Sequence, residues 1–274
     1  MKLVNRLCCI ALTLGAFSAA GAVELKPETA AAFDHYVQLT EAELSQRMKP
    51  GNFLYMDKHP RDKSALWLGQ PQVVPHQTLD HGNPIEIPEG LVQDWIGAMI
   101  LPGLTLDKVR TTLQDYPNYK NYFKPEVIDS KLDKKDGVDK KDGDRFDIFL
   151  RISKKQFLSV VLNTNYSVQY GKLDATHTYI NSHSTRIAEV KNPAKKKYDR
   201  EEPVGDDDGL LWRSNSYWRL QEADNGVYAE LEAVSLSRDI PLGLGFLLKG
   251  FLEQFPKESM ENTMRGLRQA LGVH

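Results

Sequence analysis

Cysteine is nearly absent from the chain, and this limits both its chemistry and the ways it can be stabilised. The 274 residues include only Cys8 and Cys9, which lie in an N-terminal segment that we expect to be removed. The rest of the chain then has no disulfide, no thiolate nucleophile and no cysteine ligand for zinc. Its fold must therefore be held by the hydrophobic core alone.

Other familiar signatures are also missing. The sequence has no G-x-S-x-G, P-loop or H-E-x-x-H pattern, which are the marks of common hydrolases, nucleotide-binding enzymes and zinc proteases. The acidic turn 139–144 lacks the ligand order of a calcium loop. We therefore expect no metal and no cofactor. The formal net charge is −2, and this absence of a basic excess argues against nucleic acid as a partner.

The chain begins with the pattern of a secretory signal peptide. Lys2 and Arg6 precede an apolar run over 7–17, and Ala20-Gly21-Ala22 forms an A-x-A cleavage signal. The run is shorter than the roughly 20 apolar residues that span a bilayer. We therefore expect residues 1–22 to be cleaved after about Ala22 and the mature protein to be periplasmic or secreted.

Residues 23–90 are expected to form an N-terminal extension. An alanine-rich stretch with Pro27 at its start predicts a helix over 27–49, ended by Pro50-Gly51. The following segment is rich in turn residues and has one strand candidate at 72–79. Its apolar content is low for its length, so we expect the extension to pack on a main domain, residues 91–274, rather than fold alone.

The main domain alternates short strands with hairpin turns. A strand over 91–101, two short helices in 107–125 and further strands separated by Asp-Gly and Asn-Gly turns are predicted. The last strand, 227–234, is followed by a long helix from about Gly243 that contains Pro256, where we expect a kink. Antiparallel strands with helices early and late predict an α+β fold.

Several segments resemble one family. They include Asp94-Trp95-Ile96-Gly97, Leu101-Pro102-Gly103, Asp115-Tyr116-Pro117-Asn118-Tyr119, Pro125-Glu126-Val127-Ile128-Asp129-Ser130 and Leu236-Ser237-Arg238-Asp239-Ile240-Pro241. In this order they resemble the START-like, or SRPBCC, helix-grip superfamily of the polyketide cyclase and lipid-transport type, most closely its secreted bacterial members. The resemblance implies a curved antiparallel sheet wrapped around a long, kinked C-terminal helix. It indicates a fold more strongly than a function, because this fold hosts binders, carriers and enzymes.

A candidate ligand pocket follows from the strand alternation. Aromatic and hydroxyl side chains share one face of the strand 210–221, and small apolar side chains share one face of the last strand. Such a surface is typical of a pocket wall, although it is equally typical of an ordinary sheet core. With three apolar positions of the last helix, the candidate lining residues are Trp212, Ser214, Ser216, Trp218, Ala229, Leu231, Ala233, Leu244, Leu248 and Phe251.

Three functions remain open from the sequence. The first is an exported binding or carrier protein for a hydrophobic small molecule, such as a lipid or a polyketide-like compound, with transient membrane contact. The second, which the resemblance implies, is an enzyme of the cyclase, aromatase or hydrolase kind; its candidate catalytic residues would be Arg151, Tyr179, His183 and Glu232. The third is a structural or interaction module. The sequence indicates no oligomeric state.

Overall fold

The computed structural model describes residues 23–69, 71–136, 143–155, 159–191, 193, 199–239 and 245–273, without the side chains of 154, 155, 159 and 245–255. The expected signal peptide and the side chains of Leu244, Leu248 and Phe251 lie outside this described part. Within it, no helix is both long and apolar enough to cross a membrane.

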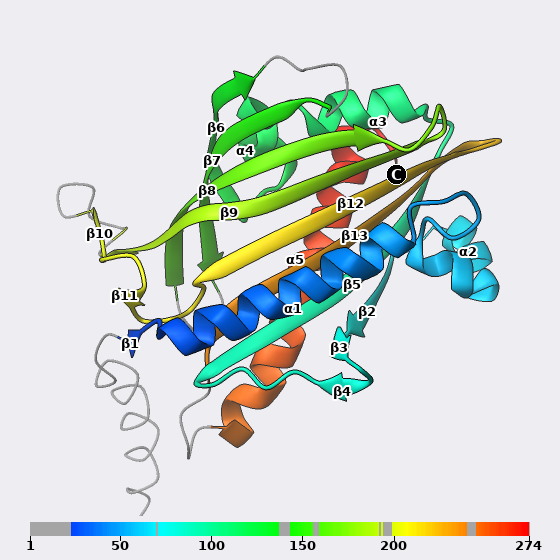
Figure 1. The fold of residues 1–274 in the computed structure, drawn as a ribbon. Coiled ribbons are helices and arrows are strands. Elements are labelled where there is room, and N and C mark those ends of the chain that lie inside the picture. Colours follow the sequence, from blue (N-terminus) through cyan, green and yellow to red (C-terminus); the bar gives the residue numbers. More distant parts are fainter. Residues whose placement is uncertain are drawn as a thin grey trace, which may run out of the picture.

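An open nine-stranded antiparallel sheet forms the centre of the molecule (Figure 1). Its order is β2-β5-β13-β12-β9-β8-β7-β6, and the short β10 pairs with β9. The strands are β2 (Gln72–His76), β5 (Gly90–Pro102), β6 (Val127–Asp136), β7 (Arg145–Lys155), β8 (Ser159–Lys172), β9 (His177–Lys191), β10 (Arg200–Glu201), β12 (Arg213–Ala223) and β13 (Gly226–Arg238). Two further small sheets pair β1 (Val23–Glu24) with β11 (Asp206–Asp207) and β3 (Leu79–Asp80) with β4 (Asn83–Pro84).

Helices cover both faces of the sheet. The C-terminal helix α5 (Gly245–Ala270) crosses one face, together with α3 (Leu106–Leu113), η4 (Tyr116–Asn118) and α4 (Tyr119–Tyr122). The N-terminal helix α1 (Pro27–Gln46) crosses the opposite face, as Figure 1 shows. The short elements η2 (Tyr55–Lys58), α2 (Pro60–Ala65) and η3 (Leu66–Leu68) follow α1. The sheet is therefore the middle layer of three.

Close approach of backbone and side chains fixes α5 on its face. A Cβ at Gly97 of β5 would lie 2.7 Å from Met260 Cγ, and one at Gly266 of α5 would lie 2.6 Å from the carbonyl oxygen of Tyr122. A Cβ at either position would force a shift of the observed packing, of a flexible side chain at Gly97 and of backbone at Gly266. The second half of α5 buries Met260 and Met264 against the sheet, in the larger of the hydrophobic clusters.

A second hydrophobic cluster lies under α1. Phe33, Tyr36 and Leu44 of the helix pack against Tyr217 and Leu236 of the sheet. Because α1 covers this face of the sheet, the polar side chains on it are buried as well. Among them are Glu230 and Glu232, each 2% exposed. The N-terminal extension thus contributes an entire layer of the structure.

The fold is an α+β START-like helix-grip fold, as the sequence resemblance predicted: α5 is held against a mainly antiparallel sheet, and two short helices lie between the first long strand, β5, and β6. The helix runs through Pro256 without interruption. Two short pairings lie in the described part of 191–209, where β10 pairs with β9 and β11 pairs with β1.

Candidate functional site

A cavity of about 380 Å³ lies between the sheet and the second half of α5. It is lined mainly by apolar and aromatic side chains of β5, β7, β8, β12 and β13, with α4 and α5 closing it. These include Trp95, Leu113, Tyr119, Phe123, Val127, Leu150, Ile152, Val160, Leu162, Tyr166, Trp218, Leu231, Ala233 and Met260. Its volume falls within the range of roughly 300–1,000 Å³ found for small-molecule sites.

The β12–β13 hairpin supplies the floor of the cavity. Trp218 pairs with Leu231, Ser216 with Ala233 and Ser214 with Ser235 across the two strands. Side chains two residues apart point to the same face of a strand, so the register places all of these residues toward α5. The tight turn at Asp224–Asn225 fixes this register, because it joins the two strands directly.

Aromatic side chains between β5 and β6 form a wall of the cavity. The rings of Tyr119 and Phe123 meet edge to face with centroids 4.8 Å apart, and the Tyr119 hydroxyl donates to the carbonyl oxygen of Leu113 at 2.5 Å. Burial raises the pKa of Tyr119 well above its ordinary value and also raises the pKa of Tyr166. Both phenols therefore remain neutral at physiological pH.

Few polar groups face the cavity. Glu126 accepts hydrogen bonds from Ser259 at 3.2 Å and from Asn262 at 2.9 Å, both on α5. The sheet side adds the hydroxyls of Ser214, Ser216, Ser235 and Ser237 and the amide of Gln93. Glu126 is the only carboxylate among the described lining residues, and these include no histidine, lysine or arginine. The cavity is thus apolar, with isolated groups that can orient a ligand.

A smaller cavity of about 160 Å³ adjoins the first and shares Tyr166 and Trp218 with it. It extends toward Tyr116, whose hydroxyl lies 3.0 Å from that of Tyr170. Its other walls include Ile148 and Ile180. Together the two cavities make an elongated, mainly apolar space under α3 and α4.

Of the ten lining residues suggested by the sequence, the structure places five on the larger cavity: Ser214, Ser216, Trp218, Leu231 and Ala233. Ala229 lies on the same face but is packed within the core, 1% exposed. The expectation for Trp212 is wrong. It precedes β12, so the strand alternation does not extend to it; its Nε1 donates to Asp207 Oδ1 at 3.2 Å, and its ring packs in the cluster under α1.

The four candidate catalytic residues do not meet in the cavity. Arg151 lies between the lining residues Leu150 and Ile152, on the other face, and pairs with Asp199 at 2.6 Å. Tyr179 lies under the Arg219 guanidinium, with 5.4 Å from its ring centroid to Cζ. His183 Nε2 lies 2.5 Å from Glu41 Oε1 on α1. These side chains occupy the face of the sheet opposite α5.

Glu232 belongs to a buried polar network on that opposite face, which sequence reasoning missed. Arg47, at the end of α1, lies 3.1 Å from Glu232 Oε2 and 3.5 Å from Glu230 Oε1. Glu230 also accepts hydrogen bonds from the backbone N–H groups of Tyr55 and Met56. Burial, and next the charge of Asp94, raise the pKa of Glu232 to about 7. The sequence signal was the pair of glutamates alternating with apolar residues in β13, which indicated a polar face but not its burial.

No family model and no curated protein matches the chain. Among solved structures, a STAR-related lipid transfer protein fragment from Xanthomonas axonopodis is similar, with 16% identity, a TM-score of 0.46 and coverage of 73% of this chain and 98% of that one. Human STARD10 has 11% identity, a TM-score of 0.43 and coverage of 73% and 70%.

A Streptomyces aromatase/cyclase, ZhuI, has 9% identity, a TM-score of 0.39 and coverage of 73% of this chain and 94% of that one. At such low identities and TM-scores, neither a ligand nor a reaction transfers to this protein. The helix-grip fold of this chain is defined by its own order of elements and by the position of α5 on the sheet.

Proposed function

We propose that this protein binds a hydrophobic small molecule in the cavity between the sheet and α5 and acts as a carrier for it. The observation that supports the proposal is a cavity of about 380 Å³ whose walls are mainly apolar and aromatic. Burial of apolar ligand surface contributes roughly 25 cal/mol per Å². The isolated hydroxyls of Ser214 and Ser216 and the amide of Gln93 would orient one polar group of the ligand.

A lipid or a polyketide-like compound has the required chemistry, since each combines a large apolar surface with few polar atoms. The signal-peptide pattern of residues 1–22 supports an exported carrier. A carrier of this kind would take up and release its ligand during transient contact with a membrane.

The composition of the cavity favours binding over catalysis. An acid–base mechanism needs two titratable groups in reach of the reacting atoms, whereas the described lining residues supply one carboxylate, Glu126, already held by Ser259 and Asn262. The phenols of Tyr119 and Tyr166 have raised pKa values because of burial, so they stay protonated at neutral pH and cannot accept a proton there.

The proposal is tested by titrating the protein without residues 1–22 with a dansyl-labelled fatty acid and following its fluorescence. The wild-type protein should bind one probe per chain. Leu231→Trp, which adds a large ring to the floor of the cavity, should weaken binding at least about tenfold, because the cavity walls are close-packed. Leu231→Met conserves the volume and should bind normally. If a folded Leu231→Trp variant bound the probe with unchanged affinity, this cavity would not be the binding site.

A further inference from the structure

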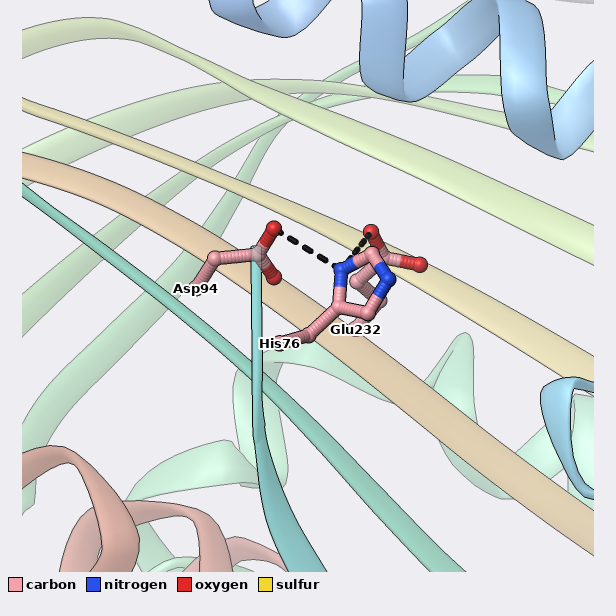
Figure 2. A group of neighbouring side chains, drawn as sticks. All are labelled: His76, Asp94 and Glu232. Atoms are coloured by element: carbon pink, nitrogen blue, oxygen red, sulfur yellow. Dashed lines mark hydrogen bonds and ion pairs between the residues drawn. The ribbon is translucent and has the colours of Figure 1, made fainter. Parts of the chain in front are cut away.

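Three side chains from three neighbouring strands meet on the face of the sheet that α1 covers (Figure 2). They are His76 of β2, Asp94 of β5 and Glu232 of β13. His76 pairs directly with Asp94 across β2 and β5, and Glu232 lies two residues from the partner of Asp94 on β13. The strand register therefore holds all three on a rigid surface, away from the cavity lined by Leu231 and Ala233.

Two of the distances between these groups are close to those between ligands of one metal ion. His76 Nδ1 lies 3.0 Å from Asp94 Oδ2 and 3.7 Å from Glu232 Oε1, and one donor atom of each residue lies within 4.8 Å of the others. Ligands of a tetrahedral zinc ion, with bonds of about 2.0–2.2 Å, lie about 3.3 Å from each other. In Figure 2 the imidazole Nδ1 is directed between the two carboxylates.

One buried oxygen of Asp94 has no hydrogen-bond partner among the described residues. Asp94 is 4% exposed, and the oxygen in question is Oδ1. Its other oxygen, Oδ2, accepts from the Tyr36 hydroxyl at 2.8 Å. A buried carboxylate oxygen without a partner is costly and is rare in folded proteins. Because Oδ2 is the oxygen that lies 3.0 Å from His76 Nδ1, a cation would satisfy Oδ1 only if it were bound by both oxygens of this carboxylate.

The surrounding charges leave room for a cation. Arg47 pairs with the carboxylates of Glu230 and Glu232, whereas among the described residues Asp94 forms its ion pair with His76. With a neutral imidazole, as metal coordination requires, Asp94 would have no cationic side chain as its partner. Arg47 holds Glu232 Oε2 at 3.1 Å, and Glu232 Oε1 is the oxygen that faces His76. Tyr36 and Arg47 thus lie where outer partners would orient carboxylates bound to a metal ion.

We propose that His76, Asp94 and Glu232 form a binding site for a divalent transition-metal ion, with Zn²⁺ as the ion that fits best. One imidazole nitrogen and two carboxylate oxygens match the ligands of zinc, whereas Ca²⁺ and Mg²⁺ prefer oxygen alone. The side chain of His76, on the edge strand β2, is 16% exposed and provides access from solvent. The bound ion would join β2, β5 and β13 beneath α1.

Sequence patterns gave no signal for this site, because its three residues lie on separate strands far apart in the chain. The same groups can also be held together without a metal, by a proton on His76 Nδ1 that bridges to Asp94. The experiment therefore has to distinguish a bound metal ion from a bridging proton.

Metal-free protein without residues 1–22 is titrated with zinc sulfate against a chromogenic competing chelator. We expect one Zn²⁺ per chain. Asp94→Asn and Glu232→Gln are close in shape to the native side chains and should weaken binding at least about 100-fold. His35→Gln is the control, since His35 pairs with Asp80 at 3.1 Å on the exposed surface and is not one of the three proposed ligands, and the affinity of this variant should equal that of the wild type.

A second measurement does not depend on how the variants fold. In ¹⁵N spectra of the wild-type imidazoles, Zn²⁺ should shift the Nδ1 resonance of His76, while the same concentrations of Mg²⁺ or Ca²⁺ should leave it in place. The proposal is overturned if the wild-type protein takes up no Zn²⁺, if the His76 resonance does not respond, or if folded Asp94→Asn protein keeps the wild-type affinity.

Discussion

Leu231 and Glu232 are neighbours in β13, and their side chains face opposite layers of the molecule. Leu231 lines the cavity beneath α5, whereas Glu232 lies 3.1 Å from Arg47 beneath α1. The period-two alternation of a strand therefore separates two environments, one apolar and one ionic. Substitutions at these two positions should accordingly have separate effects.

Replacing Arg47 by methionine should strongly destabilise the protein. Arg47 is 7% exposed and is paired with two glutamates that are each 2% exposed. Removing one partner of a buried ion pair leaves uncompensated charge and costs about 3–5 kcal/mol. Urea unfolding of the wild-type and Arg47→Met proteins measures this difference.

The exposed pair of Arg186 and Glu201 supplies the control, since Arg186→Met should cost less than about 1 kcal/mol. Adding Glu232→Gln to Arg47→Met should recover part of the lost stability, because it removes one of the uncompensated charges. Equal effects of Arg47→Met and Arg186→Met would show that the network under α1 is not buried as described.

The two close contacts of α5 should differ in their tolerance of an added methyl group. A Cβ at position 266 would meet a backbone oxygen of Tyr122 at 2.6 Å, whereas one at position 97 would meet the flexible side chain of Met260 at 2.7 Å. Gly266→Ala should therefore destabilise by about 1–3 kcal/mol, despite the higher helix propensity of alanine, and Gly97→Ala should cost less. Thermal unfolding of both variants tests this order, and the reverse order would contradict the packing of α5 on α4.

Glu189 should make stability fall as the pH rises. Burial, opposed by the hydrogen bond from the Leu210 N–H, raises the pKa of Glu189 from 4.5 to about 7, and the charge of Asp207 adds to the rise. The folded protein therefore keeps a proton that the unfolded chain loses above about pH 4.5, so the contribution of this proton is lost as the pH rises to about 7.

Glu189→Gln removes this titration. The variant should gain about 1–3 kcal/mol of unfolding free energy relative to the wild type between about pH 5 and about pH 8. Urea unfolding at both pH values measures the change. A difference between variant and wild type that is the same at both would show that Glu189 is ionised in the folded protein throughout.

The hydroxyls on the cavity floor should select ligands by their polarity more than by their size. Ser216→Ala removes a hydroxyl that faces the cavity and leaves apolar surface in its place. We expect a fatty acid to bind several-fold more weakly and a hydrocarbon of similar length to bind more tightly, because an unpaired polar ligand group loses its partner. Competition titrations with the two ligands measure the ratio, and an unchanged ratio would exclude Ser216 as an orienting group.

The fold could be predicted from the sequence because its signals are local. The alternation in β12 and β13, the Asp-Asn-Gly turn between them and the long helical period of α5 each depend on residues close together in the chain. Trp212 shows the limit of this reasoning, since alternation holds only within a strand and Trp212 lies one residue before β12.

The buried side chains under α1 could not be predicted for a different reason. The contacts among His76, Asp94 and Glu232 depend on the register of three strands, and their burial depends on α1 lying across them. Neither relation is encoded by residue spacing. Glu126 belongs to one of the segments that carry the family resemblance, yet its place on the cavity wall follows only from the packing of α5.

The proposed binding of a hydrophobic ligand is tested most directly by native mass spectrometry of the protein purified from a bacterial periplasm, followed by organic extraction. The account predicts a discrete added mass on the wild-type protein that extracts as a lipid-like compound, and its loss from folded Leu231→Trp protein. A wild-type protein that carries no added mass and takes none up from a panel of lipids would contradict it.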